Sequence, residues 1–231
     1  MNKEKRKVAI FDIDGTVFRS SLIIEIVHAL LEEGIFASVT EKIYLRAYKK
    51  WLDRRDSYEK YINAVVKAFR KNIKNVSYDC FSKIADKVVT FYKDRVYRYT
   101  RDLIKKLKKK NYYLLAISRS PKLLVEGFCR KWGFNKVYGE IYEIDERRRF
   151  TGRTLYSTLV DDKAKILRRA IEKENLTLKG SIGVGDTESD IPFLKMVERP
   201  ICFNPNQKLY KFARKAGWQI VVERKDVIYY L

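Results

Sequence analysis

Near its start the chain reads Lys7-Val8-Ala9-Ile10-Phe11-Asp12-Ile13-Asp14-Gly15-Thr16. The apolar half has the length of a buried strand, and the second half is an acidic turn containing glycine. Because side chains alternate along a strand, Asp12 and Asp14 are expected on the same side at its carboxyl end. Gly15 leaves the backbone free to turn closely around an anion. Open α/β sheets bind their ligands at this end of their strands, so a ligand site is predicted beside the two aspartates.

The rest of the chain alternates between short apolar runs and helical segments. Further strands are expected at residues 112–117, 181–184, 200–203 and 219–222, and helices at residues 100–110, 121–132, 162–174, 190–195 and 208–216. Residues 137–155 are expected to form a third short strand followed by a small β-hairpin. The alternation predicts an α/β fold with a Rossmann-like, mostly parallel sheet flanked by helices on both faces.

Residues 18–97 break this alternation. Successive amphipathic helices are expected there, at residues 21–33, 40–54, 58–71 and 78–97. Ile23, Val27, Leu30 and Leu31 form one apolar stripe on the first of them. We therefore expect a helical-bundle cap at residues 18–97, inserted into a catalytic core made of residues 1–17 and 98–231.

Composition bounds the class of protein. The 231 residues are 46% hydrophobic, and no uninterrupted apolar run approaches the roughly 20 residues that cross a bilayer. The apolar run after the basic start is too short for a secretory signal. The three cysteines, Cys80, Cys129 and Cys202, lie far apart without a CxxC spacing, which indicates neither a zinc site nor a disulfide framework. A cytoplasmic protein outside the membrane is expected.

The net charge of +21 makes polyanions natural partners. The simpler interpretation is that lysines and arginines solvate helix faces, as in residues 105–110. A small phosphorylated substrate would also be drawn to such a surface. Nucleic acid remains an alternative partner, and the oligomeric state is open.

Polar residues follow two further strands. The second strand ends in Ser118-Arg119-Ser120-Pro121, where a hydroxyl and a helix start can donate hydrogen bonds to phosphate oxygens. The strand at residues 181–184 leads into Gly185-Asp186 and then Asp190, a second acidic pair. This pair can bind Mg²⁺, which prefers a few hard oxygen ligands, although such acids also cap helices. Lys163 opens a later helix and can serve as a fixed cation. A carboxylate attacks an anionic phosphate only when such charges neutralise the repulsion.

These segments together resemble the haloacid dehalogenase superfamily of phosphohydrolases, in its phosphoserine-phosphatase-like branch with a helical cap. The matching segments are Asp12-x-Asp14-Gly15-Thr16, Ser118, Lys163 within residues 161–167, and Gly185-Asp186-x-x-x-Asp190. They occur in the family's order, and residues 203–206 with the helix after them also resemble this branch. The resemblance covers the whole expected core.

The resemblance implies a role for each residue. Asp12 would be the nucleophile, and Asp14 the general acid and then the base. Ser118 and Lys163 would hold phosphoryl oxygens. Mg²⁺ would be bound by Asp12, Asp186 and the backbone carbonyl of Asp14. Asp190 would orient either the water ligands of the ion or Lys163 without binding the ion itself. The implied reaction is Mg²⁺-dependent hydrolysis of a small phosphate monoester through an aspartyl-phosphate.

Two departures from the branch concern the substrate. Ser21 stands where the phosphoserine-specific enzymes carry a glutamate for the substrate amine, and Glu25 lies one turn further along. Arg119 stands where the branch often has glycine, and it either adds an anion contact or narrows the pocket. A phosphoserine phosphatase or a phosphotransferase of the same fold remains an alternative. A basic nucleic-acid-binding protein with a vestigial site is a further one.

Aromatic residues recur at helical spacing in the expected cap: Tyr44, Tyr48, Trp51, Tyr58 and Tyr61. We predict that they form the core of the bundle rather than a base-stacking surface. A structural role is predicted for His28, the only histidine.

Overall fold

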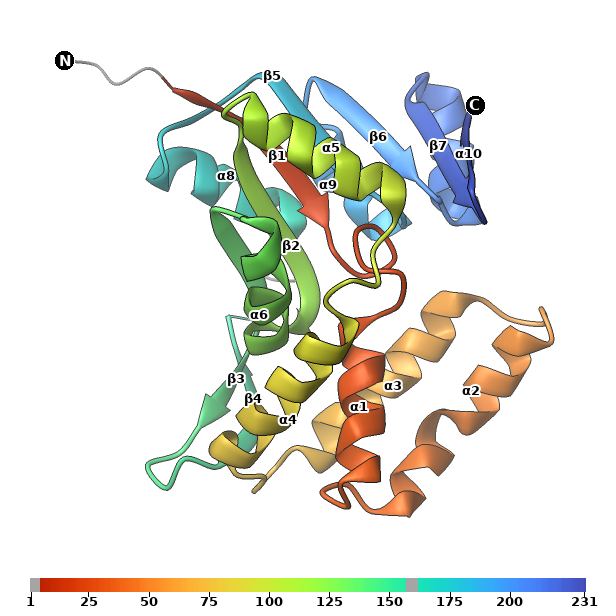
Figure 1. The fold of residues 1–231 in the computed structure, drawn as a ribbon. Helices are drawn as coiled ribbons and strands as arrows, with labels where there is room; N and C mark the ends of the chain where they lie inside the picture. The colour runs from red at the N-terminus through yellow and green to blue at the C-terminus, as the bar shows by residue number, and fades with distance from the viewer. Residues whose placement is uncertain (1–4, 157–161) are drawn as a thin grey trace.

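A computed structural model describes residues 5–156 and 162–231 (Figure 1). The strands are β1 (Arg6–Asp12), β2 (Tyr113–Pro121), β3 (Lys136–Ile144), β4 (Phe150–Leu155), β5 (Leu176–Gly185), β6 (Arg199–Phe203), β7 (Gln219–Arg224) and β8 (Val227–Tyr230). The helices that alternate with them are α5 (Arg98–Lys109), α6 (Lys122–Trp132), α8 (Lys163–Lys173), η2 (Glu188–Asp190), α9 (Ile191–Leu194) and α10 (Gln207–Ala216). The expected α/β fold is confirmed.

The strands form a sheet in the order β4-β3-β2-β1-β5-β6-β7-β8. β1 lies at its centre and pairs in parallel with both β2 and β5. The chain builds outward from β1 to β3 on one side and then returns to add β5 on the other. A crevice opens at such a switch point beyond the carboxyl ends of the strands, so the topology places the ends of β1, β2 and β5 together.

Alternation along the strands feeds a separate apolar core on each face of the sheet. Ala9 and Phe11 of β1 point to the face covered by α5 and α6. Val8 and Ile10 point to the other face, where α8, α9 and α10 pack. Because both faces of β1 are covered, the strand reads as one continuous apolar run.

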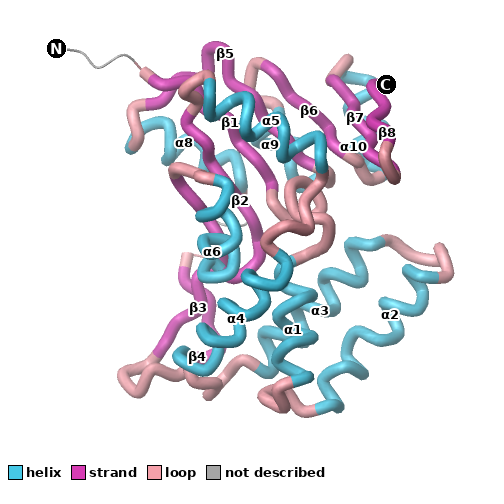
Figure 2. Tube along the Cα trace, viewed as in Figure 1, coloured by secondary structure: helices cyan, strands magenta, loops and turns pink. Residues whose placement is uncertain are grey.

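The segment between β1 and α5 is helical, as the sequence predicts, and is called the cap below (Figure 2). It comprises α1 (Leu22–Glu32), η1 (Ser38–Glu41), α2 (Lys42–Leu52), α3 (Tyr58–Asn72) and α4 (Tyr78–Tyr92). Ser57 and Ser77 are the N-caps of α3 and α4. Their side chains accept hydrogen bonds from the amides of Lys60 and Cys80. The apolar core of the cap continues into the core on the α5 and α6 face of the sheet.

The region of residues 137–155 differs from the prediction of a separate strand followed by a hairpin. β3 pairs in parallel with β2 over its first half and antiparallel with β4 over its second half. One strand therefore serves both sheet and hairpin. The hairpin also supports the cap, because Phe150 exchanges backbone hydrogen bonds with Asn75 and Val76. In addition, Arg70 of α3 pairs with the buried Glu140 of β3.

Two further differences are small. α4 ends at Tyr92 rather than at residue 97, and Val96 instead bridges to Phe18 beside the entrance to the cap. β8 forms one edge of the sheet, and the sequence analysis does not predict it. No helix in residues 5–156 and 162–231 is long and apolar enough to cross a bilayer.

Candidate active site

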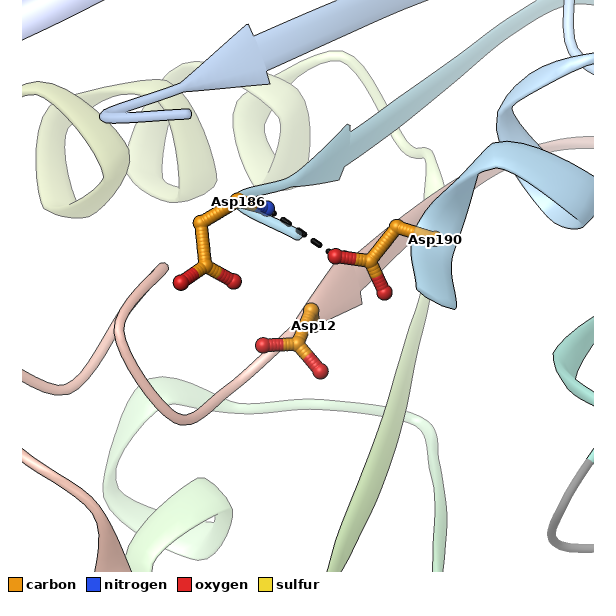
Figure 3. A group of neighbouring side chains, drawn as sticks. All are labelled: Asp12, Asp186 and Asp190. Carbon is orange, nitrogen blue, oxygen red and sulfur yellow. Dashed lines mark hydrogen bonds between the residues drawn. The ribbon is translucent and has the colours of Figure 1, made fainter. Parts of the chain in front are cut away.

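Three carboxylates meet where β1 and β5 end (Figure 3). Asp12 is the last residue of β1, Asp186 follows β5 directly, and Asp190 ends η2. Each offers one oxygen to a group whose members lie within 4.8 Å of one another. The aspartates are far apart in sequence, and the parallel pairing of β1 with β5 brings them together.

Lys163 supplies the positive charge at this group. It is the first residue of α8, whose N-cap Asp162 accepts hydrogen bonds from the amides of Ala164 and Lys165. Its ammonium lies 2.5 Å from Asp12 Oδ1 and donates a second hydrogen bond to Asp190. Lys163 is 4% exposed, so the ion pairs are shielded from water. The predicted neighbour Asp161 lies outside the described residues.

Asp190 serves the site and the local fold at once. One of its oxygens accepts from Lys163, while the other accepts from the amides of Asp186 and Thr187, each at 3.0 Å. Asp190 therefore both caps the turn that follows β5 and contacts the site through Lys163. Asp190 is fully buried, so its two oxygens hold Lys163 and the loop after β5 in fixed relation.

In the described residues, the group contains three carboxylates but only one ammonium group, that of Lys163. Burial and the carboxylates of Asp190 and Asp14 raise the pKa of Asp12 to about 7, against the opposing effect of Lys163. Burial and the neighbouring Asp12 likewise raise the pKa of Asp186 well above its usual value. Burial would lower the pKa of Lys163, but Asp12 and Asp190 raise it above its ordinary value. The carboxylates outnumber the ammonium that neutralises them, which is the charge pattern of a cation site.

Asp14 is held apart from this group by hydrogen-bond donors. Its Oδ1 accepts from the amide of Leu22 at 2.6 Å. Its Oδ2 accepts from the hydroxyls of Ser118 at 2.5 Å and Ser120 at 2.9 Å. These donors fix the Asp14 carboxylate beside the end of β2. Ser118, expected to contact phosphate, is fully buried and contacts Asp14.

Gly15 makes room for the acidic group. Its φ of +80° lies in the left-handed region, and a Cβ there would overlap Asp186 Oδ2 and stand 3.2 Å from Asp186 Cγ. Its amide donates to the backbone carbonyls of Phe18 and Ser20, each at 3.0 Å. The contribution of Gly15 in this structure is therefore space for Asp186 and a closed turn.

A cavity of about 430 Å³ lies between these residues and the cap. On the core side it is lined by Asp12, Asp14, Arg119, Ser120, Lys163 and Asp186 together with residues after β5 and β6. On the cap side it is lined by Ser21, Ile23, Tyr58, Glu59, Ile62 and Val66, among others. This volume is that of a small-molecule site.

Of the residues predicted to contact the substrate, only some line the cavity. Ser21 and Arg119 line the cavity. Glu25 is not among its lining residues and instead lies 3.4 Å from the guanidinium of Arg95 in the described structure. The turn of helix that separates Ser21 from Glu25 therefore directs the glutamate elsewhere.

Several residues that line the cavity are not predicted from the sequence, among them Ser120 and Tyr58. Ser120 lines the cavity and contacts Asp14, and its place two positions after Ser118 on the same strand could have indicated this. Tyr58 was assigned to the bundle core, as were Tyr44 and Tyr61. Tyr44 and Tyr61 are buried there, whereas Tyr58 packs partly against this core and also lines the cavity. Helical periodicity does not distinguish a core face from a face that lines a ligand cavity.

The protein is therefore an α/β protein with a doubly wound sheet and a helical cap. Its clustered carboxylates lie at the switch point of the sheet. A model of the haloacid dehalogenase-like hydrolases matches residues 9–195. The chain belongs to this family, and the predicted resemblance is confirmed.

Individual relatives agree with this placement. The chain is 24% identical over 222 residues to a phosphoserine phosphatase of Mycobacterium tuberculosis, covering 92% of this chain and 69% of that protein. Among solved structures, a protein of unknown function from Bordetella pertussis matches with a TM-score of 0.74 at 17% identity, over 94% of this chain and 98% of that one. A phospho-aspartyl intermediate analogue of phosphoserine phosphatase matches with a TM-score of 0.62 at 22% identity, over 96% of both chains. At such identities the structural matches establish the shared fold.

Proposed function

We propose that the protein is a Mg²⁺-dependent phosphatase that hydrolyses a small phosphate monoester through an aspartyl-phosphate on Asp12. The observation that carries this proposal is the buried ammonium of Lys163, held against Asp12 and Asp190 in the same group as Asp186. An exposed acidic turn would need no such cation. A nucleophilic carboxylate facing an anionic phosphate does need one.

The residues present fit a divalent cation. Three clustered carboxylates and one ammonium leave an excess of negative charge in a buried site, and the donors are the hard oxygens that Mg²⁺ prefers. Asp12, Asp186 and the backbone carbonyl of Asp14 would hold the ion. When bound, Mg²⁺ neutralises charge on the phosphoryl oxygens and on the carboxylates.

In the first half of the proposed reaction, Asp12 attacks phosphorus. Lys163 binds Asp12 Oδ1, which leaves the other carboxylate oxygen as the attacking atom. The new bond joins this oxygen to phosphorus, and the bond between phosphorus and the ester oxygen breaks. Asp14, in its protonated form, gives its proton to the departing ester oxygen.

In the second half, water attacks the aspartyl-phosphate. Asp14, now ionised, takes a proton from the water, and the bond between phosphorus and Asp12 breaks to release inorganic phosphate. The hydrogen bonds that Leu22, Ser118 and Ser120 donate hold the Asp14 carboxylate in a fixed position for this proton transfer. The cap would limit the entry of other water molecules.

Removal of Mg²⁺ is expected to stop the reaction and lower stability. Phosphate release from an aryl phosphate should vanish in EDTA and return with added Mg²⁺. At a Mg²⁺ concentration of about 100 Kd, the melting temperature should rise by roughly 5–10 °C, because ligand binding stabilises the folded state.

The Asp186→Asn variant should lose most of this thermal shift, whereas Asp102→Asn, an exposed acid on α5, should keep it. Full activity in EDTA, together with no thermal shift, would contradict the proposal.

Gly15→Ala tests the packing of the acidic group. The added methyl must displace the Asp186 carboxylate, which also accepts a hydrogen bond from Thr16 at 3.0 Å. We expect at least about a tenfold loss of kcat or of Mg²⁺ affinity, equivalent to about 1.4 kcal/mol.

Gly34→Ala is the matched control, since its φ is +68° but a methyl there meets nothing within 4 Å. Both variants should lose about 1 kcal/mol of folding stability from backbone strain. Equal catalysis in the two variants would show that the space beside Asp186 is unimportant.

A further inference from the structure

Helix α3 carries two apolar faces. Tyr61, Val65 and Phe69 are buried in the interior of the cap. Tyr58, Ile62 and Val66, spaced four residues apart, form a second stripe that lines the cavity and is partly exposed. A helix needs only one apolar stripe to pack in its own bundle. These three side chains pack in part against the core of the cap, and the part of their surface that faces the cavity is apolar and available to a bound molecule.

This stripe lies opposite the reacting groups. Tyr58 shares the cavity with Asp12, Asp14 and Asp186. Burial, and then the charges of Asp14 and Asp186, raise the pKa of the Tyr58 hydroxyl far above its usual value. Ile23 of α1 adds a further apolar side chain to the same wall. A phosphate held at Asp12 would place the rest of its ester against this wall.

The carboxylates that line the cavity are engaged within the protein. Glu59 of the cap and Glu188 of the core both approach Lys208, at 3.6 and 2.6 Å. Asp12 is paired with Lys163, Asp14 accepts bonds from its surrounding donors, and Asp186 accepts a hydrogen bond from Thr16. A substrate ammonium group would have to compete with these partners for a carboxylate. An apolar group needs no such competition.

We infer that the leaving group of the substrate is an aliphatic or aromatic alcohol without an ammonium group, whose apolar body contacts Tyr58, Ile62 and Val66. This inference rests on the proposed phosphatase function and names its substrate class. The bond between phosphorus and the ester oxygen breaks, and the alcohol departs with the proton of Asp14. Burial of its apolar surface against α3 supplies the binding energy.

Substrate preference tests this assignment first. The values of kcat/KM for phenyl phosphate and hexyl phosphate are compared with those for phosphoserine and glycerol phosphate. At least one apolar ester should exceed both polar esters by about tenfold or more. Comparison of phenyl phosphate with hexyl phosphate shows whether the site prefers an aromatic or an aliphatic leaving group.

Variants of the stripe then locate the effect. Val66→Thr keeps shape but adds a hydroxyl, and Ile62→Asn makes the wall polar. Each should lower the ratio of kcat/KM for the better apolar ester to that for glycerol phosphate by about tenfold. Val39→Thr is the matched control at an exposed valine (59% exposed) in η1, and it should leave the ratio unchanged.

The outcomes separate the two proposals. Hydrolysis with equal kcat/KM for all esters, a preference for phosphoserine, or a ratio unchanged in both stripe variants would overturn the assignment of the leaving group alone. Failure to hydrolyse any ester in the presence of Mg²⁺ would overturn the phosphatase function and the assignment together. Because the ratio is taken within each variant, a partial loss of folded protein does not alter it.

Discussion

Asp12→Asn is expected to lower kcat for phosphate release by about 10³-fold or more while leaving the protein folded. The amide keeps the shape of the carboxylate and an oxygen for Lys163, but it is a poor nucleophile. Asp12 also belongs to a buried group in which carboxylates outnumber ammonium groups. Removing one negative charge relieves repulsion, so in the absence of Mg²⁺ the melting temperature should stay the same or rise.

Steady-state assays with an aryl phosphate and thermal unfolding followed by circular dichroism measure the two effects. Asp102→Asn serves again as the control. The Asp102 side chain is exposed on α5, where it pairs with Arg101, and it does not line the cavity. A folded Asp12→Asn protein with more than about a tenth of the original kcat would be incompatible with nucleophilic attack by Asp12.

Lys163→Met is expected to damage both stability and catalysis. Methionine preserves most of the side-chain volume, but it leaves the buried carboxylates of Asp12 and Asp190 without their cation. Breaking a buried ion pair from one side typically costs about 3–5 kcal/mol. For a chain of this size that corresponds to a fall in melting temperature of roughly 6–20 °C. The loss of positive charge at the phosphoryl site should also reduce kcat by at least about 10²-fold.

The pH range of the measurement follows from the direction of the shift. The pKa of Lys163 is raised in the folded state above its ordinary value of 10.5. Its stabilising contribution is therefore fully present below 10.5 and is lost only as the pH rises through the higher folded value. A comparison at a pH between the Asp12 pKa of about 7 and 10.5, where both partners are charged, captures the whole effect.

Lys165→Met is the matched control, two residues further along the same helix. Its ammonium is exposed and lies 4.0 Å from Asp162, so the change should cost no more than about 0.5 kcal/mol. If Lys163→Met were as stable and as active as Lys165→Met, the buried ammonium would have no role in the site.

The sequence predicted most of the core because its signals are local. The run from Val8 to Phe11 is apolar on both faces of the strand, which is typical of the centre of a parallel sheet. The acids at the carboxyl ends of β1 and β5 must meet once those strands pair, and they do. The family resemblance added the identity of Lys163 among many lysines.

The features that were missed depend on packing between distant elements. Tyr58 lines the cavity as well as packing in the bundle because α3 lies across the cavity from Asp12 at the end of β1, and helical spacing does not encode this position. Glu25 turns from the cavity to Arg95, a partner 70 residues away. The double use of β3 likewise depends on pairing with both β2 and β4.

Trapping the covalent intermediate tests the proposed chemistry most directly. The protein is mixed with an aryl phosphate and Mg²⁺, quenched within the first turnovers, digested and analysed by mass spectrometry. We expect a phosphoryl group on the carboxylate of Asp12, absent from Asp12→Asn. Rapid hydrolysis with no phosphorylated Asp12, or with the phosphoryl group on another residue, would contradict it.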